Sequence, residues 1–390
     1  MCLLHYIAGA STHQPEELKN KVSAGAGDLI KRSFADIDPA RLVDYHTHVA
    51  GIGKGTDAFV NPKLLSWRHP FHHLKFKVYL SAGAVTDVER ADAQIVERLV
   101  RLVSSIEGHG KHRLLAFDKN YRRDGTANLE KTEFFVPNDY VFAIAAQHPD
   151  LFEPVISVSP YRVDAPAELE RGAQRGARMV KWLPNAMGID PADEVCDPFF
   201  QKLKELGLVL LSHGGEEKAV EAEGDQRLGN PLLLRRALDH GVKVIVAHCA
   251  GLGDNEDLDD PQRQRVPNFD LFLRLMGEQR YEGLLFADIS AMTQFNRAGR
   301  PLATILQRED LHERLVNGSD YPLPAVNALI RTSTLRKQGY ITSEERVCIN
   351  EIYDYNPLLF DFVLKRTIKV PGTEKRLPPS IFMKNAALEG

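Results

Sequence analysis

The chain has 390 residues, of which 43% are hydrophobic and 26% are charged, and its formal net charge is −4. This composition is typical of a globular protein with a sizeable core, and the length suits a single α/β barrel. The weakly acidic charge offers no basic surface for nucleic acid or an anionic membrane, and no apolar run approaches the ~18 residues of a membrane helix.

From residue 41 onward, short apolar runs typical of buried strands alternate with segments of helical periodicity. The eight predicted strands cover residues 42–49, 113–118, 151–159, 178–183, 208–213, 242–248, 283–289 and 314–320. The predicted helices cover residues 88–106, 138–148, 167–176, 198–206, 231–240, 269–277, 301–307 and 325–337. This alternation indicates right-handed crossovers onto a parallel sheet, and eight such units favour a closed (β/α)8 TIM barrel.

The connections at the two ends of the predicted barrel differ in length. Returns from helix to strand are short and contain glycine, whereas long strand-to-helix loops cover residues 50–87, 119–137, 214–230 and 250–268. Because barrel enzymes elaborate the face that carries their active site, we expect the site at the carboxyl ends of the strands. We assign the barrel to residues 41–340, an N-terminal extension to residues 1–40 and a C-terminal helical extension to residues 341–390.

Six residues that can bind metal or transfer protons lie in or at the carboxyl ends of these strands. In chain order they are His46, His48, Lys181, His213, His248 and Asp320. The His-x-His pair alone carries little information, because 14 histidines in 390 residues produce about half such a pair by chance. The ordered set on one face of a barrel predicts a metal centre.

Alternate residues of a strand point to the same side, so His46 and His48 both face the barrel interior and can bind one ion. Asp320 ends the last strand, which becomes a neighbour of the first strand when the barrel closes. It can therefore ligate a divalent metal, with zinc the expected ion, and accept a proton from the water that the metal acidifies. His213 and His248 can complete the site, and Asp320 and His248 are the candidate catalytic residues.

Lys181 leaves the number of metal ions open. A protonated amine beside a dication is unfavourable, so the amine should be neutral. A neutral amine can react with carbon dioxide to form a carbamate that bridges two ions, one held by the His-x-His pair and Asp320 and the other by His213 and His248. Without the carbamate, a single ion is held by the pair, His213 and Asp320, and His248 is free for acid–base work.

The order His-x-His on strand one, Lys on strand four, His on strands five and six and Asp on strand eight resembles the amidohydrolase superfamily. Segments 137–152 and 318–322 look like the branch that also contains aminocarboxymuconate-semialdehyde decarboxylase and several aromatic-acid decarboxylases. The decarboxylase members of that branch generally have one metal and no lysine ligand. Segment 181–185 looks like strand four of dihydroorotases, where the lysine is carboxylated. The resemblance covers about residues 41–365 and implies ligand roles for the six residues above.

Three further side chains are candidates for binding an anionic substrate. Arg68 and His72 belong to an aromatic and basic insertion, residues 67–77, in the loop after strand one, and Arg297 follows strand seven. A guanidinium can hold a carboxylate through two parallel hydrogen bonds. The alternative reading of the insertion is a packed surface lid or a subunit contact.

The sequence predicts a metal-dependent hydrolase that uses a metal-activated water to cleave a C–N or C–O bond of a small amide, lactam or lactone. Two alternatives remain: non-oxidative decarboxylation of an aromatic or muconate-like acid, and a metal-binding barrel without activity. The expected partners are a small-molecule substrate and, for assembly, a second copy in a homodimer. The four cysteines form no Cys-x-x-Cys motif and no signal peptide is recognisable, so we expect reduced thiols and a cytoplasmic location.

Overall fold

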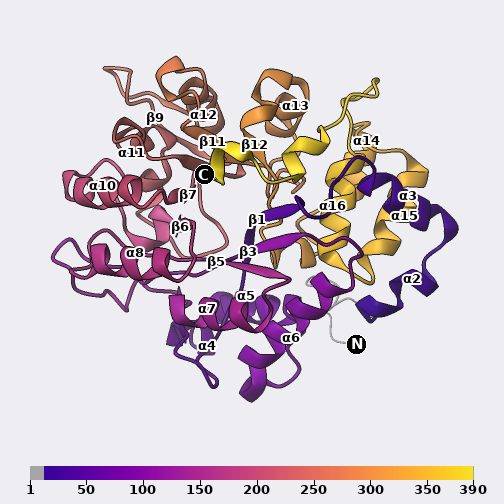
Figure 1. The fold of residues 1–390 in the computed structure, drawn as a ribbon, viewed down its shortest axis with the longest axis horizontal. Coiled ribbons are helices and arrows are strands. Elements are labelled where there is room, and N and C mark those ends of the chain that lie inside the picture. The colour runs from indigo at the N-terminus through magenta and orange to yellow at the C-terminus, as the bar shows by residue number, and fades with distance from the viewer. Residues whose placement is uncertain (1–12, 390) are drawn as a thin grey trace.

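The computed structural model describes residues 13–389 (Figure 1). Eight parallel strands form its centre and fall into two hydrogen-bonded sheets, ordered β1-β3-β5 and β6-β7-β8-β11-β12. These strands are β1 (Val43–His48), β3 (Lys111–Leu115), β5 (Phe152–Val155), β6 (Met179–Trp182), β7 (Val209–His213), β8 (Val244–Ala247), β11 (Leu285–Asp288) and β12 (Leu315–Val316). Each overlaps one predicted strand and is shorter than the prediction.

Single parallel bridges join the two sheets at both edges. Ile156, just after β5, pairs with Val180 of β6, and Thr47 of β1 pairs with Tyr321, which follows β12. The backbone N–H of Tyr45 also donates to the carbonyl of Asn317 at 2.9 Å. The strand order therefore runs once around a ring, which confirms the predicted (β/α)8 TIM barrel.

Helices cover the outside of the ring. They are α6 (Ala91–Ser104), α7 (Asn138–Gln147), α8 (Ala165–Gln174), α10 (Asp197–Glu205), α11 (Arg235–Asp239), α12 (Asn268–Met276), α13 (Arg300–Gln307) and α14 (Thr332–Lys337). In α6 the helical spacing of Ile95, Leu99 and Leu102 places one apolar face in the core. The predicted helix 325–337 begins only at residue 332, because the chain after β12 first forms the short turn η9 (Leu323–Ala325) around Pro322 and Pro324.

A filled core occupies the inside of the ring, as expected for a barrel of eight strands. Inward-pointing strand residues fill the interior with the side chains of Val43, Tyr45, Leu115, Val155, Met179, Val209, Leu211, Ile245, Ala247, Phe286 and Val316. The pairing of β1 with β3 shifts register between Asp44 and Thr47, so that His46 and His48 of the same strand line the pocket at its carboxyl end. Leu388, from the C-terminal segment, joins this cluster at the amino ends of the strands. Figure 1 shows that segment crossing the strand ring. The C-terminal segment thus covers the interior at the amino ends of the strands, opposite the predicted ligands at the carboxyl ends.

The long loop after β1 contains structure that the sequence did not predict. It forms β2 (Phe59–Val60), α4 (Pro62–Leu65) and α5 (Pro70–Ala82), and β2 pairs antiparallel with β4 (Phe134–Phe135). Helix α5 lacks a single apolar face: Phe76 is buried, whereas Phe71 and Leu74 on other sides are exposed. That mixed distribution explains why no helical pattern was recognisable over residues 70–82.

The remaining elements lie at loops and termini. They are α2 (Leu18–Lys21), α3 (Ala24–Phe34), α9 (Pro184–Met187), β9 (Asp254–Glu256), β10 (Arg265–Pro267), α15 (Ser343–Tyr353), α16 (Pro357–Thr367), and the short 3-10 turns η1 (Pro15–Glu17), η2 (Val88–Arg90), η3 (Glu194–Cys196), η4 (Gln226–Gly229), η5 (Pro231–Leu234), η6 (His248–Ala250), η7 (Gln279–Tyr281), η8 (Glu309–Arg314), η10 (Pro379–Phe382) and η11 (Ala386–Leu388). Helices α15 and α16 pack against α3, which brings the two terminal extensions together beside the barrel (Figure 1). The domain boundaries at residues 40 and 340 stay a prediction.

Three cysteines within the described residues, Cys196, Cys249 and Cys348, are free thiols, and Cys2 lies outside them. None of the helices between residues 13 and 389 combines the length and the apolar character needed to cross a bilayer.

Candidate metal centre

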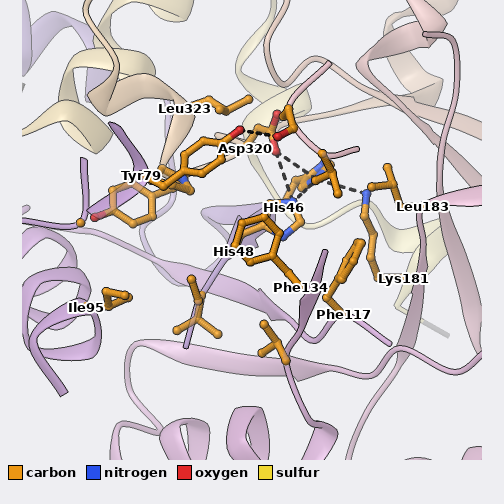
Figure 2. A pocket seen from close by; sticks show the side chains of 18 of the residues that line it. His46, His48, Tyr79, Ile95, Phe117, Phe134, Lys181, Leu183, Asp320 and Leu323 are labelled. Carbon is orange, nitrogen blue, oxygen red and sulfur yellow. Dashed lines mark hydrogen bonds and ion pairs between the residues drawn. The ribbon is translucent and has the colours of Figure 1, made fainter. Parts of the chain in front are cut away.

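The six predicted ligands all line one pocket at the carboxyl ends of the strands (Figure 2). His46 and His48 come from β1, Lys181 from β6 and His213 from β7. His248 follows β8 directly, and Asp320 lies four residues beyond the end of β12. Residues far apart in the sequence are therefore gathered by the parallel arrangement of the strands.

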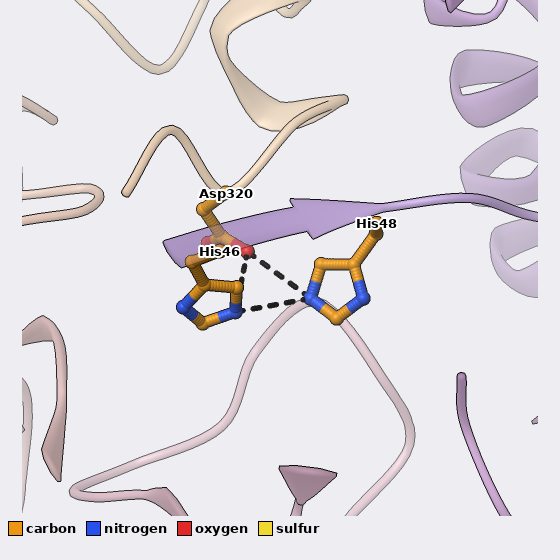
Figure 3. Close-up of side chains that lie close together, drawn as sticks. All are labelled: His46, His48 and Asp320. Carbon is orange, nitrogen blue, oxygen red and sulfur yellow. Dashed lines mark hydrogen bonds and ion pairs between the residues drawn. The ribbon is translucent and has the colours of Figure 1, made fainter. Parts of the chain in front are cut away.

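Three of these side chains point at a common position (Figure 3). The Nε2 atoms of His46 and His48 lie 3.2 Å apart, and Asp320 Oδ1 lies 3.4 Å from the former and 3.3 Å from the latter. The group is one that could hold a metal ion, with one ligand atom from each residue. Two imidazole nitrogens and a carboxylate oxygen at this spacing match the preferences of a divalent ion such as zinc.

Asp288, the last residue of β11, holds the ring of His46 from behind. Its Oδ2 atom accepts a hydrogen bond from His46 Nδ1 at 2.8 Å, and both side chains are buried. Because Nδ1 carries the proton, Nε2 presents a lone pair toward His48 and Asp320. Burial opposes ionisation of Asp288, but the charges at His46 and His248 and the hydrogen bonds hold its pKa well below the usual range.

Asp320 lies on a loop and not at the end of a strand, so the predicted strand 314–320 is wrong beyond Val316. The loop turns back over β1, where the N–H of Asp320 donates to the carbonyl of His46 at 2.7 Å. A Cβ atom on Gly318 would lie 2.6 Å from His46 Cβ, so only glycine allows this close approach. Asp320 itself has φ of 57°, in the left-handed region. The carboxylate is thus delivered to the histidines by a constrained turn.

His248 opens a left-handed turn. His248, Cys249 and Ala250 have φ of 56°, 49° and 48°, which costs about 1–2 kcal/mol per residue without glycine. Hydrogen bonds hold the histidine: its N–H donates to Asp288 Oδ1 at 2.9 Å, and its Nδ1 donates to Ser290 Oγ at 2.8 Å. Ser290 in turn donates to Asp288. Nε2 of His248 therefore presents a lone pair to the pocket, 3.8 Å from Asp320 Oδ2.

His213 offers a further unpaired nitrogen. Its Nδ1 lies 3.4 Å from Glu217 Oε2, whereas its buried Nε2 has no hydrogen-bond partner among the described residues. Burial, followed by the charge of Lys181, lowers the pKa of His213 to about 3, so the ring is neutral at pH 7. A neutral imidazole with an unpaired nitrogen is a natural ligand for a cation.

Lys181 is 1% exposed, and its Nζ lies 3.2 Å from His46 Nε2. Within residues 13–389 no carboxylate forms an ion pair with it at 4.0 Å or less. Burial lowers the pKa of Lys181, which favours the neutral amine. The donor set as a whole fits a divalent metal, because imidazole nitrogens and the carboxylate of Asp320 face one pocket.

Asp320 is ionised at neutral pH. Burial alone would raise the pKa of its carboxyl group, but the charge at His46 and the hydrogen bond and charge of His48 lower it to about 2. One oxygen, Oδ1, faces the His-x-His pair, and the other, Oδ2, faces His248. The carboxylate can therefore bind a cation with one oxygen and handle a proton with the other.

The three predicted substrate-binding residues do not line this pocket. Arg68 is exposed before α5, and His72 lines a neighbouring polar cavity with Glu133 and Asn185. Arg297 is buried after β11, where its Nη1 donates to Gln294 Oε1 at 3.1 Å. Roles for these three in binding substrate stay predictions.

Sequence reasoning missed Asp288, Ser290 and Glu217. Asp288 lies next to the end of the predicted strand 283–289, as the predicted ligands lie in or at the ends of theirs, so its position was a usable signal. Ser290 and Glu217 lie in loops whose course the sequence does not reveal, and their roles appear only from contacts with His248 and His213.

The chain is similar, at low identity, to several proteins of known structure. A TIM-barrel protein of Bordetella bronchiseptica is 16% identical, with 80% of this chain and 94% of that chain covered and a TM-score of 0.47. 5-Carboxyvanillate decarboxylase of Novosphingobium aromaticivorans, solved with manganese, is 15% identical, with 81% of this chain and 94% of that chain covered and a TM-score of 0.46. 4-Oxalomesaconate hydratase of Rhodopseudomonas palustris is 14% identical, with 72% of this chain and 81% of that chain covered and a TM-score of 0.40.

No curated protein sequence matches the chain. The amidohydrolase family model, in contrast, matches residues 43–332, which begin at the first residue of β1 and end in α14, and so include all eight strands and all six ligand positions. The chain belongs to the amidohydrolase family.

Proposed function

We propose that this protein is a metal-dependent hydrolase that cleaves the C–N or C–O bond of a small amide, lactam or lactone. Members of its family are metal-dependent enzymes. The observation that carries the proposal is the convergence of His46, His48 and Asp320 on one position at the floor of an open pocket. A divalent ion bound there, which we propose to be zinc, supplies Lewis acidity toward a water and a substrate carbonyl.

The protein's own groups account for positioning and proton transfer. Asp288 fixes the ring of His46, so that the ligand nitrogen is presented without rearrangement. Asp320 Oδ2 and His248 Nε2 are two proton acceptors 3.8 Å apart at the same end of the pocket. A proton taken from water by Asp320 can be held between them and returned to the leaving nitrogen or oxygen.

The state of Lys181 bears on the number of ions. We propose that its neutral amine adds to carbon dioxide, forming an N–C bond and releasing a proton, so that the resulting carbamate places an anion beside the histidines. Intact-protein mass with and without bicarbonate, together with metal counting in wild type and Lys181→Ala, tests this. One ion per chain in both proteins would contradict the two-ion site.

Turnover of a substrate panel tests the main proposal. Protein loaded with zinc or manganese is assayed on lactones, lactams, anilides and hydroxybenzoates, with acid release and carbon dioxide release measured separately. Hydrolysis that disappears in His46→Ala/His48→Ala, while the variant stays folded, supports the proposal. Carbon dioxide release from an aromatic acid without any hydrolysis would replace it with the decarboxylase. Bound metal with no turnover of any class would favour a barrel without activity.

A further inference from the structure

The pocket above the metal centre is walled almost entirely by apolar side chains. They come from the loop after β1, from α5 and α6, and from the ends of β3, β4 and β6: Val49, Ile52, Phe76, Leu80, Ile95, Phe117, Phe134, Val136 and Leu183, with Val220 and Leu323 at the side. In Figure 2 the labelled metal ligands gather on one side of the pocket, and Ile95 and Tyr79 lie on the other. Phe117, Phe134 and Leu183 continue this apolar lining up to the metal ligands.

The two tyrosines of the pocket bring no charge to it. Tyr79 donates its hydroxyl hydrogen to the carbonyl of Ala219 at 2.5 Å, so its hydroxyl group is already engaged. Tyr321 is buried, and burial raises the pKa of its hydroxyl group to about 12, so it stays neutral at pH 7. Among the pocket-lining residues, the charged or metal-ligating side chains all belong to the metal centre or to Glu217 beside His213.

The basic residues of the surrounding insertion do not supply a cation to the pocket. Lys75 of α5 forms an ion pair with Glu133 at 2.6 Å, and Lys77 lies over the ring of Trp67 at 4.4 Å. Neither lysine lines the pocket, and neither does Arg68, which precedes the same helix. A carboxylate placed against the apolar wall would lose its water without gaining a partner.

From this we propose that the substrate carries a neutral, apolar group, aromatic or alicyclic, beyond its reacting carbonyl, and that the pocket rejects substrates with a second, anionic group there. The inference rests on the proposed hydrolase for the chemistry but on the pocket wall for the selectivity. Phe117 and Phe134 line the pocket and offer aromatic side chains against which a ring of this kind can pack. Aryl lactones and anilides are the compounds that combine both features.

Matched substrates test the selectivity. Dihydrocoumarin and an anilide are each compared with a derivative that differs only by a carboxylate on the ring, distant from the reacting bond. We expect kcat/KM to be about 100-fold or more higher for the neutral member of each pair, since an apolar site discriminates strongly against a group it cannot solvate. Equal or higher kcat/KM for the anionic members would overturn the inference.

A charge introduced into the wall should reverse this preference. Leu80 is partly exposed, so Leu80→Arg places a guanidinium at the wall with little strain on the fold, and Leu80→Met is the uncharged control. Ile95→Arg against Ile95→Met repeats the test from α6. Circular dichroism establishes that each variant is folded. We expect kcat/KM for the anionic substrates to rise in the two arginine variants, and the methionine variants to keep the wild-type preference for the neutral substrates. If both arginine variants are folded and still prefer the neutral substrates as wild type does, the inference is contradicted.

Binding without turnover separates this inference from the proposed function. Phenylacetamide and its 4-carboxylate are titrated calorimetrically into metal-free protein, where no hydrolysis takes place. Tighter binding of the neutral amide, lost in Leu80→Arg, supports the apolar wall even if no lactone or amide is turned over in the metal-loaded assay. Equal binding of the two compounds would sink the inference while leaving the hydrolase untouched.

Discussion

At the scale of single residues, the metal centre is organised by side chains that do not themselves face the ion position. Asp288 accepts hydrogen bonds from His46 Nδ1 and from the backbone of His248, and so fixes two of the histidines from one carboxylate. Asp44 does the same for backbone groups, accepting from the N–H groups of His46 and Ser319. These two aspartates couple β1, β8, β11 and the Asp320 loop.

Replacement of Asp288 by asparagine should weaken metal binding. The amide can still contact His46, but it cannot hold the imidazole in its Nδ1-protonated form as a carboxylate does. We expect the dissociation constant of the metal to rise about 10- to 100-fold, the usual effect of losing such a partner. Competition with a fluorescent chelator measures this. Asp310→Asn, at an exposed pair with Arg308, is the control and should keep wild-type affinity.

Asparagine at position 320 should separate ligation from proton transfer. The amide oxygen can still bind a cation weakly, but the side chain can no longer take up a proton. We expect kcat to fall about 100-fold or more, with a smaller loss of metal than in the double histidine variant. Steady-state kinetics and metal analysis on the same preparations give both values. Wild-type kcat in a metal-loaded Asp320→Asn protein would assign the proton to another group, with His248 the next candidate.

At the scale of elements, the C-terminal segment covers the barrel interior at the amino ends of the strands. Leu388 packs against the interior cluster, Glu389 pairs with Arg113 at 2.6 Å, and the N–H of Asn385 donates to the hydroxyl of Tyr45 at 3.0 Å. Arg113 also lies over the ring of Tyr45 at 4.2 Å. This end of the chain therefore completes the core from the side opposite the metal centre.

Removing the Leu388 side chain should lower stability without changing the site. Leu388→Ala leaves a cavity at the amino ends of the strands, and we expect the free energy of unfolding to fall by about 2–4 kcal/mol. Urea titration at fixed pH measures the change. Activity per folded molecule should stay at the wild-type level, and Val347→Ala, at a position that is 63% exposed, should change stability by less than about 0.5 kcal/mol. An unchanged urea midpoint in Leu388→Ala would show that the segment is not part of the core.

Helix α16 contains a buried ion pair that ties the C-terminal extension to the metal loop. Lys365 Nζ lies 2.5 Å from Asp361 Oδ2 and donates to the carbonyl of Gly318 at 2.6 Å. Burial raises the pKa of Asp361 to about 6, although Lys365 opposes the shift. Between the unfolded value near 3.8 and about pH 6 the unfolded chain releases this proton first, so the contribution of Asp361 to stability falls as pH rises through that window and is constant above it.

An apolar replacement of the pair isolates this pH dependence. Asp361→Leu/Lys365→Met should be neutral or stabilising by about 1–4 kcal/mol at pH 7, whereas Asp361→Ala alone should destabilise by about 3–5 kcal/mol because Lys365 is left unpaired. Between pH 4.5 and 6.5 the double variant should lose less stability with rising pH than wild type. Urea midpoints at several pH values measure both effects, and identical slopes for the two proteins would contradict the assignment to Asp361.

At the scale of the whole molecule, the sequence predicted what depends on strand periodicity and order. All eight strands, the face of the site and the six pocket residues follow from apolar runs that end in polar residues, because parallel strands bring their carboxyl ends together. The course of long loops could not be predicted. Helix α5 was missed because its apolar residues are spread around it, and the Asp320 loop was predicted as strand because its turn depends on Gly318 passing over His46.

The metal should also act as a link between distant parts of the chain, since its proposed ligands come from β1, from β7 and from the loop after β12. An ion that binds only the folded state adds about 4 kcal/mol to the free energy of unfolding when its concentration is 1,000 times its dissociation constant. We therefore expect chelation to lower the Tm of the wild-type protein and added zinc or manganese to restore it in proportion to the logarithm of concentration. His46→Ala/His48→Ala should show a Tm that responds to neither treatment, because the position where the three side chains converge is lost while the apolar core below it is intact. A wild-type Tm that is the same with chelator and with metal would mean that these residues do not form a metal centre, independently of any substrate.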